Sequence, residues 1–137
     1  MEPYIHKVQF YESDQMGVVH HSNYIRWFEE ARIDCLDRAG LTYSKMEENG
    51  FFGATIAVSC EYRRAVRFGQ TVEIEAILTE CDERFMTIKY IVRDYESKKE
   101  RATGESKHCF IGIDGKMLSL KDQDPELYQN ILNLLNQ

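Results

Sequence analysis

The spacing of apolar residues changes along this chain, and each change marks a different kind of element. Residues 4–11 alternate between apolar and polar, which predicts a first strand followed by a polar loop. Over residues 23–39 apolar residues recur at helical spacing, which predicts a long helix whose wide apolar arc must be buried. A short side-chain oxygen at Ser22 or Asn23 can cap this helix, and Gly40 can end it in a left-handed conformation.

A short helix over residues 43–48 and four consecutive strands are expected next. Each of the first three strands has one apolar face, made by Ile56, Val58, Cys60 and Tyr62, then by Val72, Ile74, Ala76 and Leu78, then by Met86, Ile88, Tyr90 and Val92. The fourth strand covers residues 101–113 and ends at the turn Asp114-Gly115. Because the connections are short, neighbouring strands should be antiparallel.

A terminal amphipathic helix is expected over about residues 124–136, with Asp124 as its cap and Pro125 in its first turn. We therefore predict a single α+β domain over residues 1–137. One helix beside so much antiparallel sheet can bury its apolar surface only if the sheet curls around it. A curved antiparallel sheet wrapped around a long central helix is the expected architecture.

Composition narrows the function classes. The 137 residues are 43% hydrophobic, and no run approaches the roughly 20 apolar residues that span a bilayer, so we expect no membrane insertion. The first residues lack the basic and apolar regions of a secretion signal, which favours the cytoplasm. A net charge of -6 argues against nucleic-acid binding. The four cysteines lie far apart and form no Cys-x-x-Cys pair, which favours reduced thiols over a zinc or redox site.

The loop before the long helix carries the strongest chemical signal. Asp14 lies in it, and the loop can bring this carboxylate close to the first turn of the helix, where free N–H groups favour negative charge. A carboxylate beside backbone donors is a minimal arrangement for acyl transfer, since the donors polarise a carbonyl and the carboxylate attacks it or activates a water. By spacing alone, an Asp before a Gly is more often turn chemistry than catalysis.

The run from Tyr11 to Tyr24, followed by Trp27 to Arg32, resembles the signature of the 4-hydroxybenzoyl-CoA thioesterase family of hotdog-fold proteins, which includes the YbgC/FadM-like acyl-CoA thioesterases. The resemblance continues through residues 60–69 to the last strand. It implies a hotdog fold, in agreement with the periodicity. This chain departs from the family at Arg64, where many relatives have proline, and at Gln70, where many have aspartate.

The resemblance implies roles for individual residues. Asp14 corresponds to the catalytic carboxylate, and His21 to the residue whose backbone N–H holds the thioester carbonyl. Substrate contacts are implied for neighbouring positions of the same motif, namely Gly17, Val18, Asn23 and Tyr24. The resemblance also implies a homodimer or homotetramer with substrate across the subunit boundary, which would cover an otherwise unpaired sheet edge.

Other polar residues permit two interpretations. Ser59 can reach the pocket or face solvent. Arg63, Arg64 and Arg67 form a basic cluster that either contacts the phosphates of coenzyme A or is solvated. A second basic group lies near the predicted turn before the last strand.

For the histidines and the charged residues of the long helix, the sequence favours structural roles over metal binding or catalysis. His20 and His21 are adjacent, so their side chains should point apart, and no third ligand has a recognised metal spacing. Glu29 and Arg32 are spaced for an ion pair on the helix. His108 is interpreted as a packed or surface residue without chemistry.

These observations predict a hydrolase that cleaves acyl-CoA to a free acid and coenzyme A, with Asp14 as nucleophile or general base. No metal or other cofactor is expected, and coenzyme A is part of the substrate. The alternatives are a hotdog hydratase or dehydratase, and a noncatalytic acyl-group binding protein. The sequence leaves four matters open: the acyl group, coenzyme A against carrier protein, nucleophile against base, and dimer against tetramer.

Overall fold

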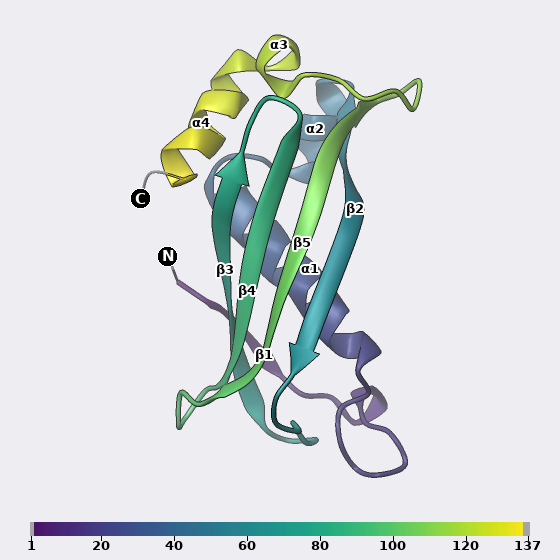
Figure 1. The fold of residues 1–137 in the computed structure, drawn as a ribbon, viewed down its shortest axis with the longest axis vertical. Helices are drawn as coiled ribbons and strands as arrows, with labels where there is room; N and C mark the ends of the chain where they lie inside the picture. The colour runs from purple at the N-terminus through teal and green to yellow at the C-terminus, as the bar shows by residue number, and fades with distance from the viewer. Residues whose placement is uncertain (1, 136–137) are drawn as a thin grey trace.

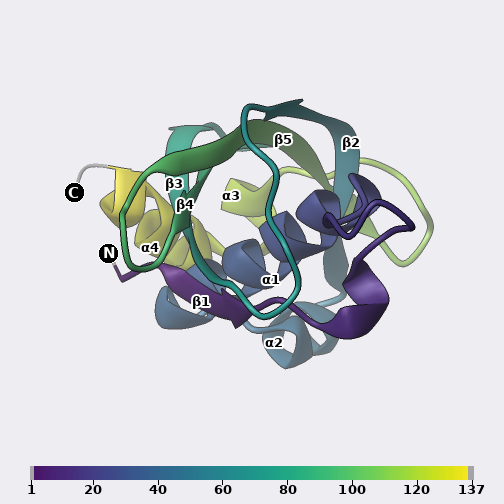
Figure 2. The same ribbon diagram turned by 90° about the horizontal axis from the view of Figure 1, so that it is seen from below.

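The computed structural model describes residues 2–135 and shows a five-stranded antiparallel sheet curled around one long helix (Figure 1). The strands are β1 (Tyr4–Lys7), β2 (Phe51–Tyr62), β3 (Thr71–Cys81), β4 (Phe85–Asp94) and β5 (Glu100–Gly112), in the spatial order β1-β3-β4-β5-β2. The helix α1 (Ser22–Arg38) lies in the hollow of the sheet (Figure 2). The predicted α+β plan and the wrapped sheet are confirmed.

The core lies between the inner face of the sheet and α1. The predicted apolar face of β4 is buried along its whole length, and that of β3 is buried except at Ala76. From the helix, Trp27 and Phe28 are almost fully buried against them. The rings of Phe28 and Tyr90 stack with their centroids 4.4 Å apart. Helix and sheet are therefore held together mainly by the burial of large side chains.

The first strand is shorter than predicted. β1 ends at Lys7, and a 3-10 helix, η1 (Phe10–Glu12), replaces the expected last residues of the strand. The chain turns because the Glu12 carboxylate accepts a 2.8 Å hydrogen bond from the Gln9 N–H. The strand prediction was wrong beyond Lys7, because the Glu12 side chain takes a backbone donor that would otherwise pair with a neighbouring strand.

The start of α1 also differs from the prediction, whereas its end does not. Neither Ser22 nor Asn23 caps the helix, because His21 is the N-cap residue. The Ser22 N–H donates to Nδ1 of the His20 ring at 3.2 Å. At the other end Gly40 has a φ of +84°, as expected for a left-handed C-terminal residue.

The apolar face predicted for β2 is only partly buried. β2 is an edge strand, and its pairing with β5 contains an irregularity between Thr55 and Ala57 that displaces Ile56 from the regular alternation. Ile56 and Val58 are 49% and 45% exposed, and Tyr62 is exposed to a similar degree. An apolar, partly open edge therefore lies beside α1.

The C-terminal segment packs against β3 and is hydrogen-bonded to Asn49, the residue that follows the short helix α2 (Tyr43–Glu48). It contains α3 (Leu120–Gln123), which the sequence did not predict, and α4 (Pro125–Leu135). Asp124 caps α4 by accepting the Leu127 N–H, as predicted. Its other carboxylate oxygen accepts from the Asn49 side chain at 2.7 Å.

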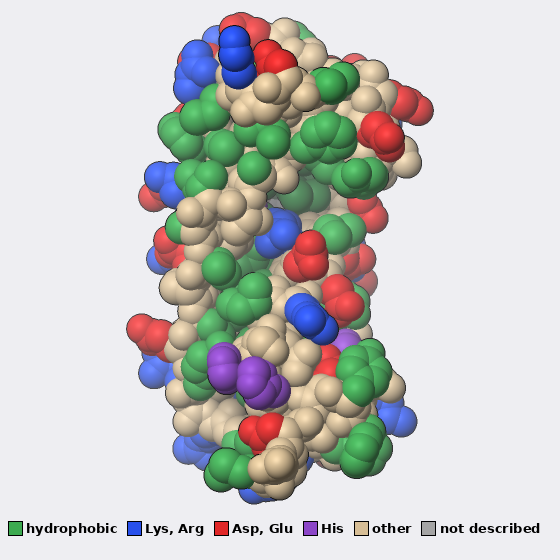
Figure 3. Space-filling view, turned by 90° about the vertical axis from the view of Figure 1, so that its right-hand side faces the viewer, with side chains coloured by type: hydrophobic (Ala, Val, Ile, Leu, Met, Phe, Trp, Pro, Cys, Tyr) green, Lys and Arg blue, Asp and Glu red, His purple; other side chains and the backbone are tan. Residues whose placement is uncertain are grey.

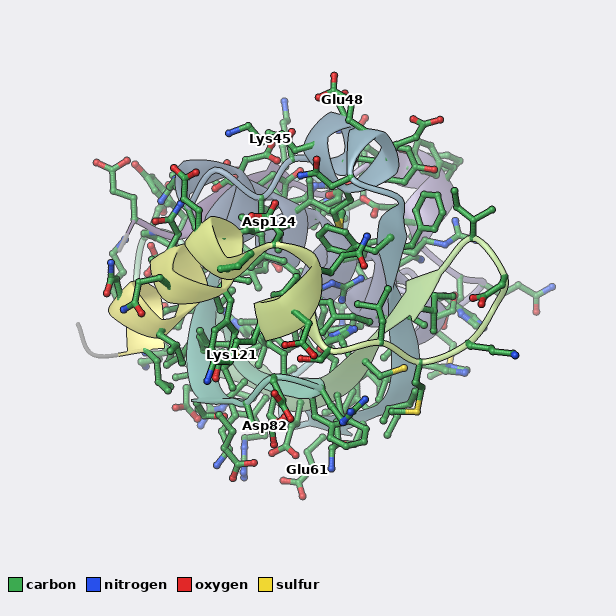
Figure 4. All side chains as sticks on the ribbon, turned by 90° about the horizontal axis from the view of Figure 1, so that it is seen from above. Lys45, Glu48, Glu61, Asp82, Lys121 and Asp124 are labelled. Atoms are coloured by element: carbon green, nitrogen blue, oxygen red, sulfur yellow. The ribbon has the colours of Figure 1, made fainter. Side chains whose placement is uncertain are left out.

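Figure 4 shows Asp124 on the same side of the molecule as Lys45 and Glu48 of α2. The C-terminal segment thus helps to hold α2 in place. Asn136, the predicted end of the last helix, lies outside the described residues. Within residues 2–135 no helix is long and apolar enough to cross a membrane.

Candidate functional site

The loop between β1 and α1 is anchored by Glu12, whose side chain is almost fully buried. Its carboxylate accepts hydrogen bonds from Trp27 Nε1 at 2.7 Å and from His6 Nε2 at 2.8 Å, besides the Gln9 N–H. Its backbone carbonyl accepts from Asn23 Nδ2 at 2.9 Å and from the N–H of His20 at 2.8 Å. These bonds join the loop to α1 at several points.

The hydrogen bonds also explain why Glu12 is charged although it is buried. Burial alone would raise the pKa of its carboxyl, but the donors from Gln9, His6 and Trp27 outweigh burial and lower the pKa. Sequence reasoning missed this anchoring role, because nothing in the local pattern shows that Glu12 is buried.

Asp14 lies at the start of a tight hairpin that Ser13 and Val19 close. Its carboxylate Oδ1 accepts from the N–H of Met16 at 2.8 Å and is 3.4 Å from the N–H of Val18. The sequence predicted that the first turn of α1 would donate to Asp14. Within residues 2–135, the donors to its carboxylate come instead from its own loop. The carboxylate is half-buried, so water and a ligand can still reach it.

The first turn of α1 offers a free donor at His21. Within the described residues, the His21 N–H has no hydrogen-bond acceptor, whereas the following amides of Ser22, Asn23 and Tyr24 are all bonded. The hydroxyl of Tyr62 on β2 donates to the His21 carbonyl at 3.0 Å. Burial and its bond to Cys60 raise the pKa of Tyr62 to about 12, so this hydroxyl stays protonated. Tyr62 thereby ties the start of α1 to the edge strand.

The other motif residues divide between the loop and the core. Gly17 has a φ of +78°, a left-handed conformation that favours glycine, and Val18 pairs with Arg67 across an isolated β-bridge. The Asn23 amide is committed to Glu12, and Tyr24 is buried with its ring 4.8 Å from that of Trp27. Asn23 and Tyr24 thus support the site from the core side.

The three arginines of the predicted basic cluster differ in their surroundings. Arg63 pairs with Glu61 at 3.2 Å and lies 4.0 Å from Glu100. Arg64 and Arg67 are exposed, and neither has a carboxylate partner in the described part of the chain. A Cβ at Gly17 would lie 3.7 Å from Arg67 Nη1, which puts Arg67 against the Asp14 loop.

Ser59 lies on the outer face of the sheet. It pairs with Glu105, which pairs in turn with the exposed Lys89, and side chains at paired positions point to the same side. The residues that alternate with them face α1. Of the two readings left open for Ser59, the structure therefore supports the one in which its side chain points away from α1.

Two predictions about charged residues were wrong. His20 and His21 do not point apart: their rings stack with centroids 4.1 Å apart. Figure 3 shows histidine side chains near the lower end of that face. Glu29 and Arg32 form no ion pair within residues 2–135, and Arg32 Nη1 instead donates to the Tyr90 hydroxyl at 3.3 Å. No three His, Cys, Asp or Glu residues among the described ones are placed to hold a metal ion.

Two cavities adjoin α1. One of about 250 Å³ lies between α1 and β2 and is lined by Ile25, Phe28, Val58 and Thr55, among others. The other, about 220 Å³, lies toward α2 and is lined mainly by apolar side chains. Arg32 lines both cavities. Together they offer a partly apolar space, with the charged side chains of Arg26, Glu29 and Arg32 along α1, that begins about one helical turn beyond His21.

Comparison with known proteins gives a consistent result. The thioesterase-like superfamily matches residues 8–131. A protein of Aquifex aeolicus with the provisional name esterase is 35% identical over 93% of this chain and 97% of its own length. Two solved structures superpose with TM-scores of 0.89: a hypothetical protein of Thermus thermophilus, 31% identical, covering 98% of this chain and 99% of its own, and the DHNA-CoA thioesterase of Staphylococcus aureus, 25% identical, covering 98% and 93%. The predicted hotdog fold is confirmed.

Proposed function

The chain belongs to the thioesterase-like superfamily, and we propose that it hydrolyses acyl-CoA thioesters with Asp14 as the working carboxylate. The observation that carries this proposal is the His21 N–H, which has no acceptor among residues 2–135 and lies at the start of α1 beside the loop that contains Asp14. Within the superfamily, the motif from Tyr11 to Tyr24 supports the 4-hydroxybenzoyl-CoA thioesterase branch with its YbgC/FadM-like members.

In this proposal the His21 N–H donates a hydrogen bond to the thioester oxygen and stabilises the negative charge that develops on it. A preorganised donor of this kind contributes most when charge appears in the transition state. Asp14 either removes a proton from the attacking water or attacks the carbonyl carbon itself, forming an anhydride that water then cleaves. In both routes the C–S bond breaks and the thiolate of coenzyme A leaves. The water oxygen enters the free acid when water attacks the thioester carbon, and it enters the Asp14 carboxylate when water opens the anhydride at the Asp14 carbon.

The surroundings of the loop fit the rest of the substrate. Arg67 lies against the Asp14 loop, and neither it nor Arg64 has a carboxylate partner among residues 2–135. These two are therefore better candidates for phosphate contacts than Arg63, which is already paired. Gly17 and Val18 would line the approach to the thioester. In this proposal Ser59 does not contact a substrate bound to its own subunit. No metal or redox cofactor is required.

The open edge supports a homodimer or homotetramer as the working form. β2 presents twelve residues of edge strand, and the apolar side chains of Ile56 and Val58 are half-exposed beside the 250 Å³ cavity. A second copy along this edge would pair free backbone groups and close the cavity. Sedimentation equilibrium of the native protein and of Val58→Glu tests this. A native protein that sediments as a monomer would contradict it.

The activity is tested by trapping the thiol released from a panel of acyl-CoA thioesters. Asp14→Asn should lower kcat by about a hundredfold or more, in the range usual for loss of a general base or nucleophile. Asp122→Asn, an exposed residue on α3, is the matched control and should leave kcat unchanged. Retention of near-native kcat in Asp14→Asn would refute the proposed role of Asp14.

The same panel separates the alternative functions. A noncatalytic acyl-group binding protein would bind acyl-CoA without releasing thiol. A hotdog hydratase would add water to an enoyl-CoA and leave the thioester intact. Single turnover in heavy-oxygen water distinguishes the two routes for Asp14, because label in the Asp14 carboxylate requires direct attack.

A further inference from the structure

The cavities beside α1 contain a cation without a charged partner. The guanidinium of Arg32 is half-buried and lines both spaces, yet no carboxylate of residues 2–135 lies within 4.0 Å of it. Glu29 lines the same two cavities one turn earlier on α1 but is beyond that distance. A half-buried positive charge loses hydration and is stabilised when an anion approaches it.

A chain of hydrogen bonds leads from Arg32 across the inner face of the sheet. Arg32 can only donate, so the Tyr90 hydroxyl accepts from it. The Tyr90 hydroxyl is hydrogen-bonded to Ser106 Oγ, 2.6 Å away, and Ser106 Oγ is hydrogen-bonded to Nε2 of His108 at 2.7 Å. The other ring nitrogen of His108, Nδ1, lies 3.2 Å from Thr55 Oγ1.

The two hydrogen bonds of the His108 ring are consistent with a neutral histidine. His108 is 3% exposed, and its burial together with the positive charge of Arg32 lowers its pKa to about 4. The ring therefore accepts at one nitrogen and donates at the other near neutral pH.

Arg32, Ser106 and Thr55 all line the 250 Å³ cavity. The cationic donors there are the remaining N–H groups of the half-buried Arg32 and the exposed guanidinium of Arg26, which has no carboxylate partner among residues 2–135, and the apolar Ile25, Phe28 and Val58 lie beside them. Such a space suits an aliphatic chain that ends in an anionic oxygen acceptor. Figure 3 shows this side of the molecule, with charged side chains set among hydrophobic ones.

We propose that this cavity binds a terminal carboxylate, so that the preferred substrate is the coenzyme A monothioester of a dicarboxylic acid. The inference rests on the proposed thioesterase function and names its substrate class. Arg32 is eleven residues beyond His21, which is roughly 16 Å along the helix axis, and helical side chains lean back toward the N-terminus. The acyl chain is therefore of intermediate length, roughly six to twelve carbon atoms.

The test compares matched thioesters with the purified native protein. For each chain length from about four to twelve carbons, kcat/KM is measured for the plain acyl-CoA and for the acyl-CoA with a terminal carboxylate. We expect a preference of tenfold or more for the carboxylate at the best length. Arg32→Met should reduce this preference to less than about twofold, with the plain acyl-CoA changed less than threefold. Arg32→Lys should retain part of the preference, because it keeps the charge.

Glu29→Gln is the second variant, and it should increase the preference because it removes a nearby negative charge. Three results would overturn the inference: equal rates for both substrates at every length, a stronger preference for a terminal hydroxyl than for a carboxylate, or equal loss of both substrates in Arg32→Met. Circular dichroism of each variant shows that it is folded.

Failure of the proposed function gives a different pattern, in which the native protein releases thiol from no thioester. The binding site is then judged by calorimetry with two thioethers of coenzyme A, one with a plain alkyl chain and one with a terminal carboxylate. Tighter binding of the carboxylate that is lost in Arg32→Met supports the site, and equal binding rejects it.

Discussion

The indole N–H of Trp27 donates a 2.7 Å hydrogen bond to the buried carboxylate of Glu12, fifteen residues earlier in the chain. This bond connects the second turn of the central helix to the loop that carries Asp14. The same carboxylate also accepts hydrogen bonds from His6 and from the Gln9 N–H, so it joins the loop both to the segment before it and to α1.

Glu12→Ala should lower the free energy of unfolding by about 2–4 kcal/mol, because several buried donors lose their acceptor. It should also reduce thiol release, since the Asp14 loop loses its anchor. Urea denaturation measures the first effect. The control is Glu30→Ala, whose half-exposed carboxylate accepts from Tyr4 and should contribute less than about 1 kcal/mol. If the two variants unfold at the same urea concentration, Glu12 is not the anchor.

Tyr62→Phe should impair catalysis more than stability. The change keeps the ring against Tyr24 and removes only the hydroxyl that donates to the His21 carbonyl. The start of α1 then has one constraint fewer, so kcat/KM should fall by roughly threefold to tenfold while the unfolding free energy changes by less than about 1 kcal/mol. Tyr95→Phe, at the turn between β4 and β5, is the matched control. A Tyr62→Phe enzyme with native kinetics would show that this hydroxyl does not position His21.

Gly104→Ala should lower the free energy of unfolding by about 1–3 kcal/mol because it overpacks the core. A Cβ at this position would lie 2.3 Å from the Phe28 ring and 2.8 Å from the Ser59 carbonyl oxygen. Gly53→Ala provides the control, since a Cβ there meets nothing within 4 Å. Thermal unfolding of both variants measures the difference. Partial recovery in the double variant with Phe28→Leu would identify the ring as the cause, and equal melting temperatures for the two glycine variants would contradict the packing argument.

Stability should decrease as the pH falls from about 6.5 to about 4. Burial, followed by the charge of Arg32, lowers the pKa of His108 from 6.5 to about 4 in the folded state, so the unfolded chain takes up this proton first. The contribution of His108 is complete above the unfolded pKa and is lost as the pH falls, by up to about 3 kcal/mol. Urea denaturation at several pH values gives the free energy of unfolding as a function of pH. Between about pH 6.5 and pH 4 this free energy should change less steeply in His108→Gln than in the native protein. An unchanged slope would mean that His108 is not held neutral.

Much of the fold follows from local patterns in the sequence. The alternation over Val72 to Leu78 and over Met86 to Val92 corresponds to strands whose faces are largely buried, because strand geometry puts every second side chain on the same side. The turn at Gly115 and the cap at Asp124 were predicted for the same reason, since each depends on a few consecutive residues. The short α3 was missed, because it lacks enough turns to show a period.

The site was predictable only as a motif. The run around Asp14 indicated the chemistry, but nothing local indicated that Glu12 is buried, that Ile56 and Val58 lie on an open edge, or that Asp14 bonds to its own loop. Arg32 and Tyr90 are 58 residues apart, and their contact exists only because the sheet closes around α1. By itself the sequence determined the order of elements and the candidate carboxylate, since these depend on neighbouring residues. Only the tertiary structure decided which polar groups meet inside the curled sheet, because burial and hydrogen bonding between distant residues are set by the packing of the whole chain.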